Sequence, residues 1–241
     1  MLVRGTGSCV VIALVGTLGV AVGFVGAIGG VMTLVSAIAS KSEQHHRRAL
    51  TWVFVMAGGC VLAVAAMEIA LLRDDFSLQY VAANSTRATP LLYKIATLWG
   101  ALEGSLLLWA FVLSLYVTAV AISFRRRIED RLVAWALLTM LLVCVFFFGI
   151  LVGPADPFGT LAIAPIDGDG LNPLLRNHPL MAIHPVMLYL GYVGFTVPFG
   201  FAVAALVTGR LGEGWLLLTR IWTLIAWVSL TVGILLGAWW S

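Results

Sequence analysis

The chain has 241 residues, of which 61% are hydrophobic and 10% are charged, and its formal net charge is +3. Because ordinary soluble domains carry roughly a quarter of charged residues, this composition excludes a water-soluble globular protein. The net charge is small and the basic clusters are short, which favours membrane lipid as their partner and argues against nucleic acid.

Six apolar runs are long enough to cross a hydrocarbon core of about 30 Å as helices. They predict spans at 10–39, 51–72, 101–124, 132–152, 179–207 and 219–240. The expected fold class is therefore all-α: a polytopic integral membrane protein with about six transmembrane helices in a single domain, residues 1–241. The first run is too long for the core of a signal peptide, so we expect it to be retained as a helix.

Within the first predicted span, glycines recur at steps of three and four residues, at Gly16, Gly19, Gly23, Gly26 and Gly30. This spacing places them on one face of a helix. A stripe of small residues lets another helix approach closely, so we interpret it as a packing surface rather than a channel lining.

The distribution of basic residues predicts the orientation in the membrane. The loops after the first, third and fifth spans hold nine of the 14 Lys and Arg residues, and the opposite side holds five. Cytoplasmic loops carry the excess of such residues. Both termini are therefore expected outside, on the periplasmic face of the inner membrane in a cell that has two membranes.

Two long segments, about 73–98 and 153–178, lie between spans on this outer side and mix polar with aromatic and aliphatic residues. Loops longer than about 12 to 15 residues usually bind something or are disordered. Their mixed composition argues against disorder. The functional surface is therefore expected on the outer side.

The first cluster of candidate residues is 99–105, at the start of the third span. Gly100 and Gly104 have the spacing of a small-residue helix contact, and Trp99 and Glu103 would share a neighbouring face. A carboxylate at this depth is costly, so Glu103 is either a functional group or an interfacial anchor. Glu68, near the outer end of the second span, carries the same two interpretations.

Two histidines, His178 and His184, lie where the chain enters the fifth span from outside. Each stands before a proline, a residue suited to a helix's first turn, so either histidine could mark a helix entrance. Six residues on a regular helix leave their side chains about 120° from a common direction, so they cannot clamp one metal. Imidazole here fits an interfacial anchor or an axial haem ligand, and composition alone favours the anchor.

The last two spans carry further signals. Pro198 lies deep in the fifth span and predicts a kink there. Trp239 and Trp240, at the outer end of the sixth span, fit an aromatic belt or contact with a flat hydrophobic ligand.

Five motifs occur in one order from about residue 76 onward, at 80–85, 98–109, 171–175, 184–195 and 220–227. In this order they resemble the CcmF family of cytochrome c maturation proteins and its relative in nitrite reductase assembly. Two positions depart from the family pattern. Val186 stands where the family usually has a second proline, and the family often has an Asp-Pro-Gly-like turn near His178.

The resemblance implies a subunit of a haem lyase that works outside the membrane. Such a protein receives haem b from a small haem chaperone. The haem iron is then reduced, and the haem vinyl groups are joined to an apocytochrome c. Further implied partners are the thiol-reducing and apocytochrome-presenting subunits of the maturation complex. By resemblance His184 is an axial ligand of the haem iron, and the supporting residues are Trp99, Gly100, Glu103, Gly104, Asn172, Pro185 and Tyr189.

The family also has a second outward histidine, two transmembrane histidines that hold a resident b-type haem, and a tryptophan-rich segment that begins after residues like Trp239 and Trp240. We expect these beyond residue 241, in the rest of a longer protein rather than in a separate chain of a split one, and residues 1–241 alone to be inactive. A membrane transporter or proton-translocating subunit is the alternative from another class. A non-catalytic scaffold of a split protein is the third possibility.

Overall fold

The computed structural model describes residues 6–40, 43–172, 178–210 and 212–240. Six helical segments within these residues are long and apolar enough to cross a membrane: Val11–Ser40, Gln44–Leu72, Leu102–Ser123, Arg131–Val152, Leu180–Thr208 and Gly214–Trp240. The described residues contain no β-strand beyond an isolated bridge between Leu78 and Thr160. The predicted all-α class and the six spans are therefore confirmed.

Seven long helices build these spans. They are α1 (Thr6–Ser40), α2 (Glu43–Leu72), α5 (Leu102–Ser123), α6 (Arg131–Val152), α7 (Leu180–Gly194), α8 (Thr196–Thr208) and α9 (Gly214–Trp240). Four short elements connect them: α3 (Gln79–Asn84), α4 (Leu91–Ala96) and the 3-10 turns η1 (Thr97–Trp99) and η2 (Arg125–Arg127). Residues 43–48 are polar but belong to α2, because a helix does not have to end where the apolar run ends.

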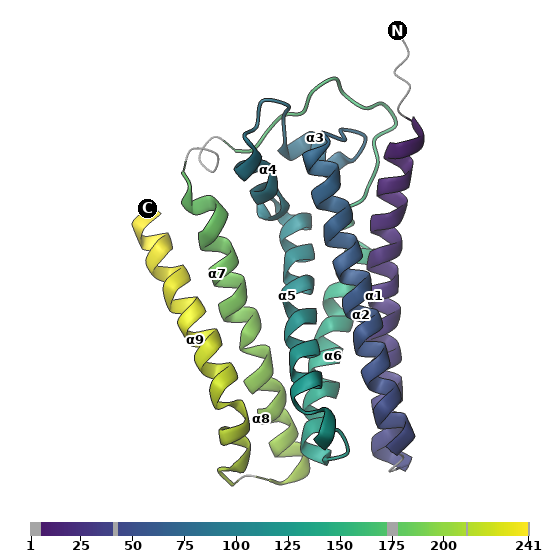
Figure 1. The fold of residues 1–241 in the computed structure, drawn as a ribbon, viewed down its shortest axis with the longest axis vertical. Coiled ribbons are helices and arrows are strands. Elements are labelled where there is room, and N and C mark those ends of the chain that lie inside the picture. The colour runs from purple at the N-terminus through teal and green to yellow at the C-terminus, as the bar shows by residue number, and fades with distance from the viewer. Residues whose placement is uncertain (1–5, 41–42, 173–177, 211, 241) are drawn as a thin grey trace.

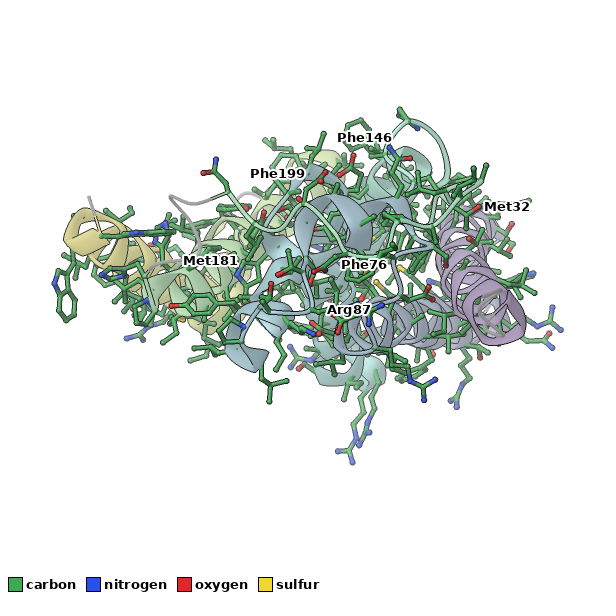
Figure 2. All side chains as sticks on the ribbon, turned by 90° about the horizontal axis from the view of Figure 1, so that it is seen from above. Met32, Phe76, Arg87, Phe146, Met181 and Phe199 are labelled. Carbon is green, nitrogen blue, oxygen red and sulfur yellow. The ribbon has the colours of Figure 1, made fainter. Side chains whose placement is uncertain are left out.

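The long helices stand side by side in an elongated bundle, with α1 near one end and α9 at the other (Figure 1; seen from above in Figure 2). Helix α1 packs against α2 and α6, and α9 packs mainly against α7. The first residues of α1 and the last residues of α9 lie at the end of the bundle that carries α3 and α4, as Figure 1 shows. We call this the outer end, and the end with η2 the inner end.

The glycines of α1 pack as predicted, but on two faces instead of one. A Cβ on Gly26 would lie 2.5 Å from the backbone nitrogen of Met56, and one on Gly19 would lie 2.7 Å from that of Ala63, so this face meets the backbone of α2. On the second face, a Cβ on Gly23 would collide with the Phe148 ring of α6. The glycines thus admit two neighbours of α1.

The fifth span is interrupted where the kink was predicted. Helix α7 ends at Gly194 and α8 begins at Thr196, with Phe195 between them. Pro198 has no backbone N–H to donate to the Gly194 carbonyl, which removes one helical hydrogen bond at this point. The fifth span is therefore divided into two helices at Phe195.

The two long outer segments fold against each other as an ordered layer. Backbone hydrogen bonds join Gln79 N to Gly159 O and Leu161 N to Ser77 O, both at 2.8 Å. Lys94, 9% exposed, pairs with Asp74 at 2.6 Å. Three basic residues of the orientation argument, Arg4, Lys41 and Arg176, and positions 173–175 of one motif lie outside the described residues.

Candidate functional site

The first candidate residue, His184, is held between two helices. It lies in the second turn of α7, and its Nδ1 is 2.8 Å from the backbone oxygen of Gly233 in α9. A carbonyl oxygen only accepts hydrogen bonds, so Nδ1 must carry the proton. In the neutral ring the Nε2 atom then keeps its lone pair, which is the form that binds a metal.

A glycine of α9 makes this contact possible. A Cβ on Gly237 would lie 2.6 Å from Cε1 of His184, so a larger residue would push the imidazole away. Gly237 receives the ring, whereas a Cβ on Gly233, one turn earlier, would lie 2.8 Å from Cδ2 of Leu188 and would push α7 away from α9. Their four-residue spacing is visible in the sequence, but nothing there indicates that the neighbour is a histidine.

Trp240, at the outer end of α9, contacts both outer histidines. Its ring is edge-on to His184, with centroids 5.8 Å apart, and stacks on His178 at 6.0 Å with an interplanar angle of 22°. The 120° separation does not apply, because His178 precedes Pro179 and lies outside α7. His184 lies one turn inside the helix, so the expectation of a histidine at the helix entrance fits His178 and is wrong for His184.

The two histidines nevertheless differ in the nitrogen that they offer. The backbone N–H of Leu180 donates to Nδ1 of His178 at 3.2 Å. In the neutral ring of His178 the proton therefore sits on Nε2, which becomes a donor and not a metal ligand. Of the two, only His184 offers an Nε2 lone pair.

Trp99 and Pro185 act together at the start of α7. Pro185 lacks the N–H that would bond to the carbonyl of Met181, four residues earlier. The indole Nε1 of Trp99 donates to that same oxygen at 2.8 Å. This bond ties η1 to the turn that precedes His184, and it links two predicted supporting residues that are far apart in the sequence.

A small apolar cluster completes this contact at the outer end. Its buried members are Ala96, Leu171 and Met181, with Trp99 and Trp240 packed against them. A Cβ on Gly100 would lie 2.7 Å from Cδ2 of Leu171, so the glycine makes room for the outer loop. Asn172, the residue after Leu171, is exposed beside this cluster.

Gly100 and Gly104 do not form the predicted small-residue surface for contact with another helix, because they do not lie on one helix. Gly100 lies before α5, which begins at Leu102, so Trp99 and Glu103 do not share a helical face either. Gly104 instead faces the carbonyl of Leu98 and the hydroxyl of Tyr80, both of which a Cβ would strike. Tyr80 donates from that hydroxyl to the Thr97 carbonyl at 2.7 Å. The spacing argument assumed one continuous α-helix through residues 99–105, but residues 97–101 precede α5 and are not α-helical.

Tyr189 belongs to an aromatic cluster within the bundle. The ring of Trp109 stacks on Phe147 at 4.5 Å and meets the edge of Tyr189 at 6.2 Å, while Tyr192 is tilted against it at 4.9 Å. The cluster joins α5, α6 and α7. Tyr189 therefore supports the helix that carries His184 without contacting its ring.

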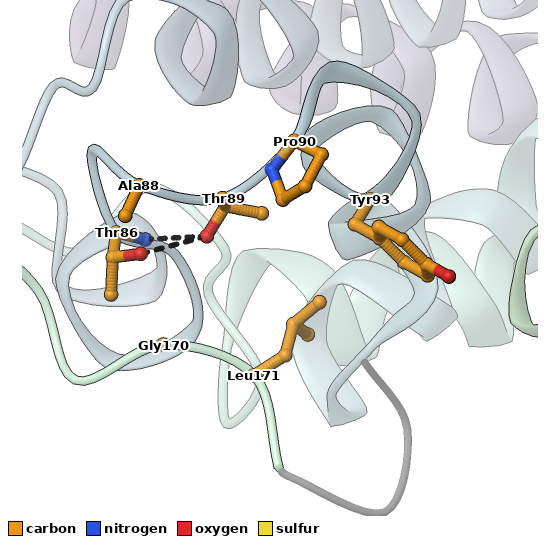
Figure 3. A pocket seen from close by; sticks show the side chains of 7 residues that line it. All are labelled: Thr86, Ala88, Thr89, Pro90, Tyr93, Gly170 and Leu171. Carbon is orange, nitrogen blue, oxygen red and sulfur yellow. Dashed lines mark hydrogen bonds between the residues drawn. The ribbon is translucent and has the colours of Figure 1, made fainter. Parts of the chain in front are cut away.

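Among the hollows of the outer layer, two bear on the candidate residues. One of about 240 Å³ lies between the outer loops, with Tyr93 and Leu171 in its wall and Thr86 bonded to the Thr89 hydroxyl (Figure 3). Leu171 places it next to the apolar cluster. The other, of about 320 Å³, has Glu103, Gln79, Asn84 and Asp156 among its lining residues. Glu103 thus faces a polar hollow and does not join His184.

The fold and the site define a polytopic helical membrane protein that presents an imidazole at one end of its bundle. The chain belongs to the cytochrome c assembly protein family, whose model, described as "Cytochrome C assembly protein", matches residues 99–241.

Curated relatives agree with this family. CcmF of Pseudomonas aeruginosa, named a cytochrome c-type biogenesis protein, is 47% identical over 74% of this chain and 27% of its own length. CcmF of Escherichia coli K12 is 44% identical, and NrfE of Haemophilus influenzae is 38% identical. Each of these matches covers 80% of this chain and 30% of the relative's own length. The chain thus spans 27 to 30% of the length of these relatives.

A solved structure agrees as well. It is named "Cytochrome c Heme Lyase CcmF" and matches with a TM-score of 0.81 at 36% sequence identity. The match covers 100% of this chain and 37% of the chain in that structure.

Proposed function

We propose that this chain is the part of a cytochrome c haem lyase that receives haem b at the outer end of the bundle. The observation that carries the proposal is the bond from His184 Nδ1 to the Gly233 carbonyl, which leaves Nε2 free for iron. Family membership and the name of the similar solved structure support the same function.

Each residue of the site would have its own part. His184 would bind the iron of the delivered haem, and Trp240, edge-on to that imidazole, would contact the flat porphyrin. The bond between Trp99 and Met181 would fix the turn that carries His184. The haem would supply iron and vinyl groups, and an apocytochrome c the cysteine thiols. A second axial ligand would come from outside the described residues.

The remaining partners follow from the family. A small haem chaperone would deliver the haem, and thiol-reducing and apocytochrome-presenting subunits would prepare the acceptor. The resident b-type haem would be held by other parts of the longer protein. The outer layer built from residues 73–98 and 153–172 is the surface on which such partners would assemble.

A chimera tests the function directly. Residues 1–241 would replace the matching segment of Escherichia coli CcmF in a strain that lacks its own copy. We expect the strain to accumulate holocytochrome c, measured by haem-stained gels. A chimera that reaches the wild-type level in the membrane and yields no holocytochrome c would contradict the proposal.

The orientation is a separate prediction, carried by the nine-to-five distribution of Lys and Arg. Reporter fusions after Arg48, Arg127 and Arg210 should report the cytoplasm. Fusions near Asn84 and Asp169 should report the periplasm. An active periplasmic reporter at Arg127 would overturn this orientation.

The third prediction concerns Glu103, whose side chain faces the polar hollow beside Gln79 and Asn84. Glu103→Gln keeps a hydrogen-bonding group there and should retain most maturation in the chimera. Glu103→Leu places an apolar side chain among these groups and should strongly reduce it. If both variants yield normal amounts of holocytochrome c, Glu103 is only an interfacial anchor.

A further inference from the structure

A hollow of about 360 Å³ lies at the inner end, far from the site around His184. Its walls come from three spanning helices and the turn before α6: Ala37, Ile38, His46, Glu129, Arg131 and Ala134. Helix α1 ends at Ser40 and α6 begins at Arg131, so the hollow sits where these spans leave the apolar layer. It is therefore at the level of lipid headgroups.

Of the three consecutive charged residues 129–131 beside this hollow, only Asp130 forms an ion pair among the described residues. Asp130 accepts a hydrogen bond from Leu132 N at 3.1 Å and pairs with Arg210 at 2.5 Å. Its neighbours Glu129 and Arg131 both line the hollow, yet among the described residues neither forms an ion pair, with the other or with a third group. Two opposite charges thus face one space without neutralising each other.

The remaining walls are apolar or buried. Ala37 and Ala134 are 0% exposed, and Ile38 packs against the main core. His46 is 5% exposed and forms part of the same wall. A ligand here would need a positive and a negative group at its polar end and an apolar portion beyond.

We propose that this hollow binds phosphatidylethanolamine. The phosphate would contact Arg131, the ammonium would donate to Glu129, and the acyl chains would leave the hollow along the partly exposed Ile38. A purely anionic lipid would leave Glu129 facing a like charge. A choline lipid has no N–H to donate to the carboxylate. The apolar wall favours a lipid over a soluble phosphate ester.

The test measures which lipid stays bound. The full chain, or the chimera, is reconstituted in vesicles of phosphatidylglycerol mixed equally with phosphatidylethanolamine or phosphatidylcholine, and retained lipid is counted by native mass spectrometry. We expect phosphatidylethanolamine to be retained over both other lipids. Glu129→Gln and Arg131→Gln should each lower its retention about fivefold, the contribution of one charge at a membrane surface.

Matched controls remove the same charges elsewhere at the inner end. Arg126→Gln and Glu213→Gln change exposed side chains that do not line the hollow, and both should retain the lipid. Equal retention of the ethanolamine and choline lipids would overturn the proposal, and so would preference for phosphatidylglycerol. An equal loss in the control variants would also overturn it. None of these outcomes depends on haem binding or on cytochrome c maturation.

Discussion

Replacing His184 with alanine should abolish cytochrome c maturation by the chimera, or reduce it at least tenfold, while the protein still inserts in the membrane. The substitution removes the imidazole whose Nδ1 is fixed by the Gly233 carbonyl and whose Nε2 is free. No other side chain at this position reproduces the iron–nitrogen bond, and tenfold corresponds to only about 1.4 kcal/mol. Holocytochrome c on haem-stained gels, normalised to chimera in the membrane, measures the effect.

His178→Ala is the matched control, because it removes the other histidine that contacts Trp240. Its Nδ1 accepts a backbone hydrogen bond, so its loss should affect a loop contact and leave most maturation intact. Imidazole added to the medium should restore the His184 variant by entering the space of the lost ring. A His184→Ala chimera that matures cytochrome c normally without added imidazole would refute ligation.

Gly26→Ala should destabilise the bundle by about 1–3 kcal/mol, the usual cost of an extra methyl group in a close-packed contact. The added Cβ would lie 2.5 Å from the backbone nitrogen of Met56 and 2.7 Å from its Cα, so α1 and α2 would have to move apart. Unfolding in mixed micelles of increasing SDS content measures the change.

Gly58→Ala in α2 is the control for this substitution. A Cβ there meets nothing within 4 Å. The change should be neutral or stabilising by up to about 1 kcal/mol, because alanine loses less conformational freedom in a helix than glycine. If both variants unfold at the same SDS content, the close approach of α1 to α2 does not limit stability.

The sequence by itself determined the membrane class, the number of spans and the placement of the two long segments at the same end of the bundle. Length and hydropathy decide these properties locally, because about 20 apolar residues must span the hydrocarbon whatever surrounds them. Proline likewise acts locally. Pro198 interrupts its helix near the predicted position because the missing N–H is a property of the residue itself.

Only the tertiary structure decided how the candidate residues meet. Trp99 reaches Met181 because Pro185 frees a carbonyl there, a relation between residues 82 apart. His178 and His184 meet on Trp240 because the chain is not helical at His178, whereas helical spacing had separated them. Which imidazole nitrogen is free depends on Gly233 and Leu180, that is, on backbone atoms. Side-chain spacing cannot encode such contacts, since the carbonyl and N–H groups that set them belong to every residue alike.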